Sequence, residues 1–229
     1  QLFPSGHLHE ADDRDTCQGH GFLQQTLGAA AQRPGRPVKG DFTMKMHIIG
    51  TGTATVSKYI NTSCVFEEDD QLFLVDGTGG SDILRAFDTM NLNWKKLHYA
   101  FLSHEHTDHF LGMIWVIRTI AELLELEEYE GDYYLYGNDE VLGKVLHVCR
   151  MILKKRSQAF LETRIKFVLV KDHERKHILN YDFTFFDIGS TKAKQYGFLM
   201  EYDNGKKLVF AGDEPLKENG KKYSKNVDW

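Results

Sequence analysis

The chain of 229 residues lacks several features that would mark it as a secreted or membrane protein. Its three cysteines stand at wide spacings and form no Cys-x-x-Cys motif, so a disulfide scaffold is not expected. No apolar run approaches the roughly 18 residues of a membrane-spanning helix. The N-terminal segment has no compact apolar stretch of the kind that secretory signals contain. These absences favour a protein of the reducing cytoplasm with no membrane association.

The charge balance and the glycine patterns exclude further classes. Lys and Arg number 28 against 33 Asp and Glu, a formal net charge of −5, which argues against a protein that coats nucleic acid. Gly50-Thr51-Gly52 does not continue as a dinucleotide-binding Gly-x-Gly-x-x-Gly, because residue 55 is Thr. No Gly-x-Ser-x-Gly is present, so a serine hydrolase elbow is not indicated. Hydrophobic residues make up 41% of the chain, which is enough for a sizeable core.

Residues 1–43 differ in composition from the rest of the chain. They contain no Ile, Tyr or Trp, and they hold three of the four Pro and six of the 20 Gly. From Met44 onward Lys predominates over Arg and an ordered pattern begins. We therefore predict that Met44 is the natural start and that residues 1–43 are a disordered or non-native extension, whose His and Cys match no standard zinc pattern. The folded domain is expected to span residues 44–229.

The remaining sequence alternates strand-like and helix-like segments. The apolar segments 110–126 and 139–154 predict helices, and Ser81 is the expected N-cap of another. Short β-rich runs predict strands at Lys45–Gly50, 61–67, Gln71–Val75, Leu97–Leu102, 133–136, 165–170, 183–186, 198–202 and 207–210. Strands in runs broken by helices indicate an α/β or α+β sheet with helices packed on one face.

The chemistry of the sequence is concentrated in one motif, directly after the predicted strand Leu97–Leu102. His104, His106, Asp108 and His109 form a His-x-His-x-Asp-His pattern, and a strand end with a tight loop can bring these side chains together. Imidazole nitrogen and carboxylate oxygen suit Zn²⁺, and also Mn²⁺ or Fe²⁺. Four donors in six residues are too many for one open catalytic ion, whereas two and two suit a pair of ions.

This motif after a strand resembles the metal-binding pattern of the metallo-β-lactamase fold hydrolases. Residues 49–52 (IGTG) with 61–63 (NTS) resemble the N-terminal strands of the ribonuclease Z-like branch, and residues 74–79 (LVDGTG) are similar to that branch's strand with a glycine-rich turn. Residues 208–213 (LVFAGD) resemble the strand that ends in an Asp bridging both metals. The resemblance covers residues 44–229 and implies an αββα sandwich that is incomplete at the C-terminus.

The resemblance implies a role for each polar residue of these segments. It gives five metal ligands: His104, His106, Asp108, His109 and Asp213. The first two would hold one ion, the next two would hold the other, and Asp213 would bridge them. Asp108 is also expected to act in catalysis, and Asp76 to support the ligand loop from behind. The implied cofactor is two divalent ions, zinc before manganese or iron.

The sequence departs from that family in two places. The family has a His shortly before a Gly and the following strand, and residues 187–197 contain none. A second family His lies beyond the bridging Asp, whereas the last His of this chain is His177. We interpret the second difference as a C-terminal truncation and the first as a divergent site helped by water, Ser190 or Asp187. With three protein donors per ion, weak metal occupancy and little activity are expected, and two tightly held metals would contradict this.

The predicted function is metal-dependent hydrolysis, in which a metal-bound hydroxide attacks a small phosphodiester or an RNA. That substrate preference is an analogy, and esters, lactams and thioesters stay open. The alternative is a non-catalytic member of the fold with a structural or binding role. A homodimer is compatible with either hypothesis. The basic cluster of residues 154–156, Arg164 and Lys166 is interpreted as a solvated face, and His173 and His177 as surface residues of a loop.

Overall fold

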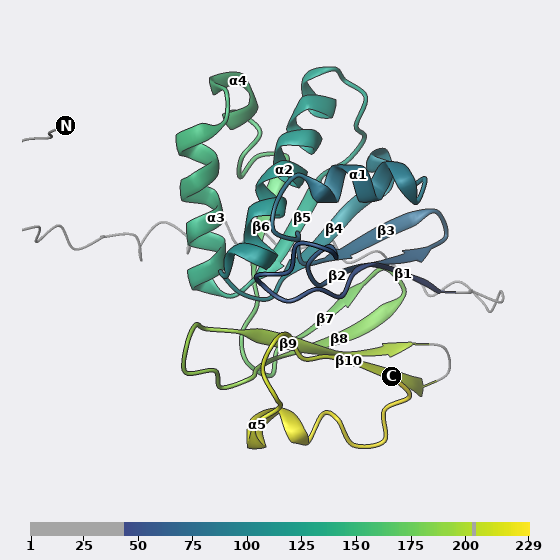
Figure 1. Ribbon diagram of the computed structural model, residues 1–229. Coiled ribbons are helices and arrows are strands. Elements are labelled where there is room, and N and C mark those ends of the chain that lie inside the picture. Colours follow the sequence, from purple (N-terminus) through teal and green to yellow (C-terminus); the bar gives the residue numbers. More distant parts are fainter. Residues whose placement is uncertain (1–43, 203–204) are drawn as a thin grey trace, which may run out of the picture. The chain divides into compact units, whose positions relative to one another are not determined.

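The computed structural model describes residues 44–202 and 205–229, so the prediction of disorder for residues 1–43 lies outside the described residues. A six-stranded sheet has the order β1-β2-β3-β4-β5-β6 (Figure 1). Its strands are β1 Lys45–Gly50, β2 Ser63–Glu68, β3 Gln71–Val75, β4 Leu97–Leu102, β5 Tyr133–Gly137 and β6 Ile165–Leu169. The pairs β1–β2 and β2–β3 are antiparallel, and β3 to β6 are parallel.

Helices connect the parallel strands and cover one face of this sheet (Figure 1). The connections are α1 Asp82–Thr89 and η1 Trp94–Lys96, then α2 Thr107–Glu125, then α3 Asp139–Ile152 and α4 Lys155–Gln158. Parallel neighbours need such crossovers because the chain must return to the same end of the sheet. Buried residues of the helices form one core with Leu72, Leu74 and Leu102 of the strands. The predicted packing of helices on one face of this sheet is therefore confirmed.

A second sheet lies against the other face of the first. It is antiparallel, has the order β10-β9-β8-β7, and is built from β7 Arg175–Ile178, β8 Tyr181–Asp187, β9 Tyr196–Tyr202 and β10 Lys206–Phe210, with α5 Glu218–Lys221 after it. Phe73 and Phe101 point between the sheets, where their rings meet those of Phe183 and Phe198. Strands β3 and β4 are thus largely buried on both faces, which explains their mostly apolar sequences.

The structure differs from the sequence-based predictions at the start of one helix and at one strand. Helix α2 begins at Thr107, not at residue 110, so Asp108 lies in its first turn, where a negative charge is favourable. Strand β7 was not predicted, because its sequence RKHI is short and charged, as is common at a sheet edge. His177 lies in that strand and not in a loop, although it is exposed as expected. Within the described part of the chain, no helix combines the length and apolarity needed to cross a bilayer.

Candidate metal centre

The His-x-His-x-Asp-His motif joins the carboxyl end of β4 to the first turn of α2. His106 is the N-cap residue of α2, with extended dihedral angles (φ −62°, ψ 145°), and Asp108 and His109 follow in the first turn. Asp213 comes from the second sheet, in the turn after β10. His109 and Asp213 are 104 positions apart in the sequence, and their side chains lie in contact. The centre is therefore formed by both sheets.

The turn after β3 packs directly against the start of α2. The N–H of Gly77 donates to the carbonyl oxygen of His109 (2.8 Å), and the N–H of Gly112 donates to that of Thr78 (3.0 Å). A Cβ atom on Gly112 would lie 1.6 Å from the carbonyl oxygen of Gly77, so only glycine fits at this position. This close approach brings the residue before Gly77, Asp76, up to the motif.

Asp76 is fully buried and holds both ends of the motif. Its Oδ1 accepts from the N–H of Ser103 (2.8 Å), and its Oδ2 accepts from the Ser103 hydroxyl (2.8 Å) and from Nδ1 of His109 (2.7 Å). Because the Ser103 hydroxyl donates to Asp76, it accepts from Nδ1 of His104 (2.9 Å). Both histidines are thereby fixed through Nδ1, which leaves Nε2 to face the other candidate ligands.

Five candidate donor atoms converge on the side away from Asp76. His104 Nε2 lies 2.9 Å from His106 Nδ1, and His109 Nε2 lies 3.4 Å from Asp108 Oδ2. Asp213 Oδ2 lies 3.8 Å from His104 Nε2 and 3.0 Å from His109 Nε2. Ligand atoms of His104, His109 and Asp213 all lie within 4.8 Å of one another. Asp213 is therefore close to both halves of the motif.

The surroundings shift the pKa values of the two buried histidines in opposite directions. Burial lowers the pKa of His104 to about 4, and the nearby carboxylates oppose this only in part. Burial also acts to lower the pKa of His109, but the carboxylates of Asp76 and Asp213 outweigh it and raise this pKa to about 10. The hydrogen bond from His109 lowers the pKa of Asp213. At neutral pH the metal-free centre thus has a neutral His104 and a protonated His109.

The chemistry of this donor set fits a divalent metal. Histidine nitrogens and carboxylate oxygens are the ligands that Zn²⁺ takes in proteins, and Mn²⁺ and Fe²⁺ accept them as well. His104 and His109 also have what metal-binding histidines have, a hydrogen bond on the nitrogen opposite the candidate donor. The residues present can therefore hold a metal ion at this edge of the sandwich.

The segment that lacks the family's histidine is held by other contacts. The Ser190 hydroxyl donates to Glu214 (2.9 Å), and Asp187 accepts from the N–H of Gly189 (2.8 Å). The Asp187 carboxylate is not part of the cluster of His104, His109 and Asp213. These contacts give no support to the expectation that Ser190 or Asp187 helps to hold an ion.

Two residues around the motif were not found by the sequence reasoning. Ser103 links Asp76 to His104, and Asn138 donates to the carbonyl oxygen of Ser103 (3.4 Å). The available indication for Ser103 was a hydroxyl at a buried strand end, directly before the motif. The available indication for Asn138 was its residue type, which is common at a helix N-cap, directly before a predicted helix. That indication does not reveal its contact with Ser103.

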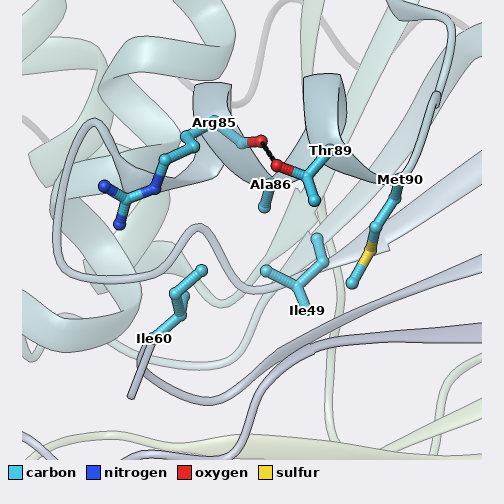
Figure 2. A pocket seen from close by; sticks show the side chains of 6 residues that line it. All are labelled: Ile49, Ile60, Arg85, Ala86, Thr89 and Met90. Carbon is cyan, nitrogen blue, oxygen red and sulfur yellow. Dashed lines mark hydrogen bonds between the residues drawn. The ribbon is translucent and has the colours of Figure 1, made fainter. Parts of the chain in front are cut away.

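A separate cavity of about 240 Å³ lies beside α1 and is mostly apolar (Figure 2). Its lining residues are Ile49, Ile60, Arg85, Ala86, Thr89 and Met90. The Arg85 guanidinium is paired with Asp82 (2.5 Å), and the Thr89 hydroxyl donates to the carbonyl oxygen of Arg85 (2.8 Å). None of the candidate metal ligands lines this cavity.

Two solved structures share the overall fold of this chain. The metallo-β-lactamase fold protein YhfI from Bacillus subtilis matches 81% of this chain and 69% of its own, with a TM-score of 0.63 and 20% sequence identity. Human tRNase Z, short form, matches 81% of this chain and 76% of its own, with a TM-score of 0.59 and 16% identity. The expected α/β metallo-β-lactamase fold, with two sheets and helices, is confirmed.

Curated relatives are similar over a shorter region. Ribonuclease Z from Bacteroides fragilis is 35% identical over 81 residues, which are 34% of this chain and 26% of the relative. Ribonuclease Z from Methanococcus aeolicus is 28% identical over 109 residues, 47% of this chain and 32% of the relative. The chain thus spans about a quarter to a third of the length of these curated relatives, which are distant homologues.

A family model covers almost all of the described chain. The model, described as Anti-Pycsar protein Apyc1, matches residues 44–227. The matched segment contains both sheets, the His-x-His-x-Asp-His motif and Asp213. On this evidence the chain has the metallo-β-lactamase fold and belongs to the Apyc1 family of anti-Pycsar proteins.

Proposed function

We propose that the chain is a metal-dependent phosphodiesterase that hydrolyses a cyclic nucleotide. The observation that carries the proposal is the cluster of His104, His109 and Asp213 at one edge of the sandwich, with His106 beside His104 and Asp108 beside His109. The substrate class is supported by the family match, because the Apyc1 family is assigned to cyclic nucleotide phosphodiesterases.

In this proposal the cluster holds two divalent ions, most readily zinc, with manganese or iron as alternatives. His104 and His106 would hold one ion, and Asp108 and His109 would hold the other. Asp213 would serve both, which is supported by its short distances to His104 and His109. When bound, such ions polarise the phosphoryl group and lower the pKa of water.

The protein's own residues orient the donors and handle the proton. Asp76 fixes His109 directly and His104 through Ser103, so the candidate donor nitrogens keep their directions. Hydrolysis forms one bond from phosphorus to a water oxygen and breaks one ring ester bond, and the leaving oxygen takes the proton that water gives up. We assign the transient acceptance of that proton to Asp108, whose side chain is buried beside His109.

The arginines of the basic cluster are ion-paired, which favours a small nucleotide over RNA as the substrate. Arg156 lies 2.5 Å from Glu125, and Arg164 lies 2.9 Å from Asp132. Charges paired in this way offer less attraction to a phosphate backbone than free ones. The pairing agrees with the interpretation of this cluster as a solvated face.

The test is a hydrolysis assay on the purified chain with Zn²⁺ or Mn²⁺. The substrates are 3′,5′-cyclic AMP, GMP, CMP and UMP, bis(p-nitrophenyl) phosphate, and a precursor tRNA. We expect conversion of at least one cyclic nucleotide to the linear monophosphate, at a low rate. Asp108→Asn should lower that rate on the order of 100-fold or more, whereas His177→Ala, which changes an exposed histidine outside the centre, should not.

Three outcomes would contradict the proposal in different ways. Cleavage of the precursor tRNA alone would make the chain a ribonuclease. Metal binding without cleavage of any substrate would favour the non-catalytic alternative. An equal rate for wild type and Asp108→Asn would place the reaction elsewhere in the molecule. The expected weak metal occupancy stays a prediction, which elemental analysis of the purified chain would check.

A further inference from the structure

Asn138 stands at the junction between β5 and α3 and is almost fully buried, with 1% of its surface exposed. It is the N-cap residue of α3, and its side-chain Oδ1 accepts from the N–H of Val141 (3.0 Å). That contact satisfies one of the free N–H groups at the start of the helix. A cap of this kind uses only the side-chain oxygen, so the NH₂ group of Asn138 has no role in the helix.

The amide group of Asn138 ties together two other segments. Nδ2 donates to the carbonyl oxygen of Lys194 (3.0 Å) and to that of Ser103 (3.4 Å). The orientation of the amide is fixed by its partners, because Oδ1 faces an N–H group and Nδ2 faces two carbonyl oxygens. One buried side chain thus connects the start of α3, the end of β4 and the segment before β9.

The contact with Ser103 leads directly to the metal centre. Ser103 precedes His104, its hydroxyl accepts from Nδ1 of His104, and its N–H and hydroxyl both donate to Asp76. The Ser103 carbonyl oxygen also accepts from the N–H of Tyr196 (3.0 Å). Asn138 therefore contacts the same residue that orients His104, although its own hydrogen bonds are with Ser103, Lys194 and Val141 and not with a candidate ligand.

The contact with Lys194 fixes the segment that lacks the family's histidine. Lys194 is further held by an ion pair with Asp139 (2.5 Å), the residue after Asn138. The segment between β8 and β9 is thereby attached to the start of α3 by a side chain and a backbone carbonyl. Asn138 thus binds both this segment, through Lys194, and the residue before the His-x-His-x-Asp-His motif, Ser103.

We propose that Asn138 is a positioning residue of the metal centre, which sets the direction of His104 through Ser103 and fixes the neighbouring 188–195 segment. This inference rests on the proposed function only in that the centre binds metal. The competing explanation is that Asn138 is a helix cap and nothing more. The two explanations differ in which atoms of the side chain matter.

Substitutions can separate the cap from the two donations. Asn138→Ser and Asn138→Asp keep a side-chain oxygen that caps a helix about as well as Asn, but remove both N–H donors. Asn138→Ala removes the cap and the donors together. Asn93→Ser is the matched control, because Asn93 caps the short helix η1 through the N–H of Lys95 (3.0 Å) and is exposed.

The readout is titration with Co²⁺ alone, followed by its visible absorption, with thermal unfolding measured in parallel. Co²⁺ reports both affinity and ligand geometry without requiring turnover. We expect Asn138→Ser and Asn138→Asp to bind Co²⁺ about 10-fold or more weakly, in the range seen when hydrogen bonds behind a metal ligand are lost, with an altered spectrum. Their helix content should stay that of the wild type, and Asn93→Ser should match the wild type in both measurements.

Two results would overturn the inference while leaving the metal centre intact. In the first, both cap-retaining variants bind Co²⁺ with wild-type affinity and spectrum, and only Asn138→Ala is destabilised, so that Asn138 is a cap alone. In the second, neither cap-retaining variant folds, so that Asn138 serves general stability. A wild-type chain that binds no Co²⁺ would overturn the inference together with the proposed metal centre.

Discussion

At the scale of single residues, Asp76 shows how one buried carboxylate organises the centre. It has no exposed surface, and its carboxylate accepts hydrogen bonds from Ser103 and His109. Its position after an apolar strand was visible in the sequence, and the resemblance implied a supporting role. The mediation by Ser103 was not predictable, because a serine before a motif does not show which carboxylate it will meet after folding.

Asp76→Asn should weaken metal binding about 10- to 100-fold, because the hydrogen bonds that orient both histidines lose their charged acceptor. The same change should lower the pKa of His109, which the Asp76 carboxylate helps to raise. Zinc competition titration and histidine NMR would measure the two effects. Asp182→Asn is the matched control, since Asp182 pairs with exposed His177 (2.9 Å) on the surface. Unchanged zinc affinity in Asp76→Asn would remove Asp76 from the centre.

At the scale of elements, the sequence predicts the buried strands better than the boundaries near the site. Apolar runs such as Gln71–Val75 and Leu97–Leu102 were predicted with the bounds they have, because strands buried on both faces are mostly apolar. The start of α2 was placed three residues late, since the polar motif looks like a loop. Its helical geometry comes from packing on the turn after β3, which no local pattern shows.

Gly112→Ala on α2 should be strongly destabilising, by about 2 kcal/mol or more, because its Cβ would overlap the carbonyl oxygen of Gly77. The helix would have to move away from that turn, which should also reduce metal affinity. Gly143→Ala on α3 is the matched control, since no atom lies within 4 Å of its added Cβ. That variant should be stabilised by up to about 1 kcal/mol, as expected in a helix interior. Chemical denaturation of both variants checks this, and equal effects would contradict the close approach.

At the scale of the whole molecule, the centre links two sheets that are distant in the chain. The motif was evident because four possible metal ligands lie within six consecutive residues. Asp213, in contrast, was identified only because its segment resembles a known strand ending. Contacts such as that of His109 with Asp213 depend on how the second sheet packs on the first. Since metal bound between them is present only in the folded state, its binding should stabilise the entire sandwich.

The stabilisation by bound metal should depend on pH through the protonation of His109. Its pKa in the folded, metal-free protein, about 10, is above the ordinary value of 6.5, so its proton stabilises that state fully below pH 6.5 and progressively less as the pH rises toward 10. A metal on Nε2 must displace this proton, whereas His104, with a pKa of about 4, has none to release at neutral pH. Metal affinity should therefore rise about tenfold per pH unit between pH 6.5 and 9, with about one proton released from the protein. Calorimetric titration with Zn²⁺ in two buffers of different ionisation enthalpy measures that proton, and a release near zero would show that Asp76 and Asp213 do not hold His109 protonated.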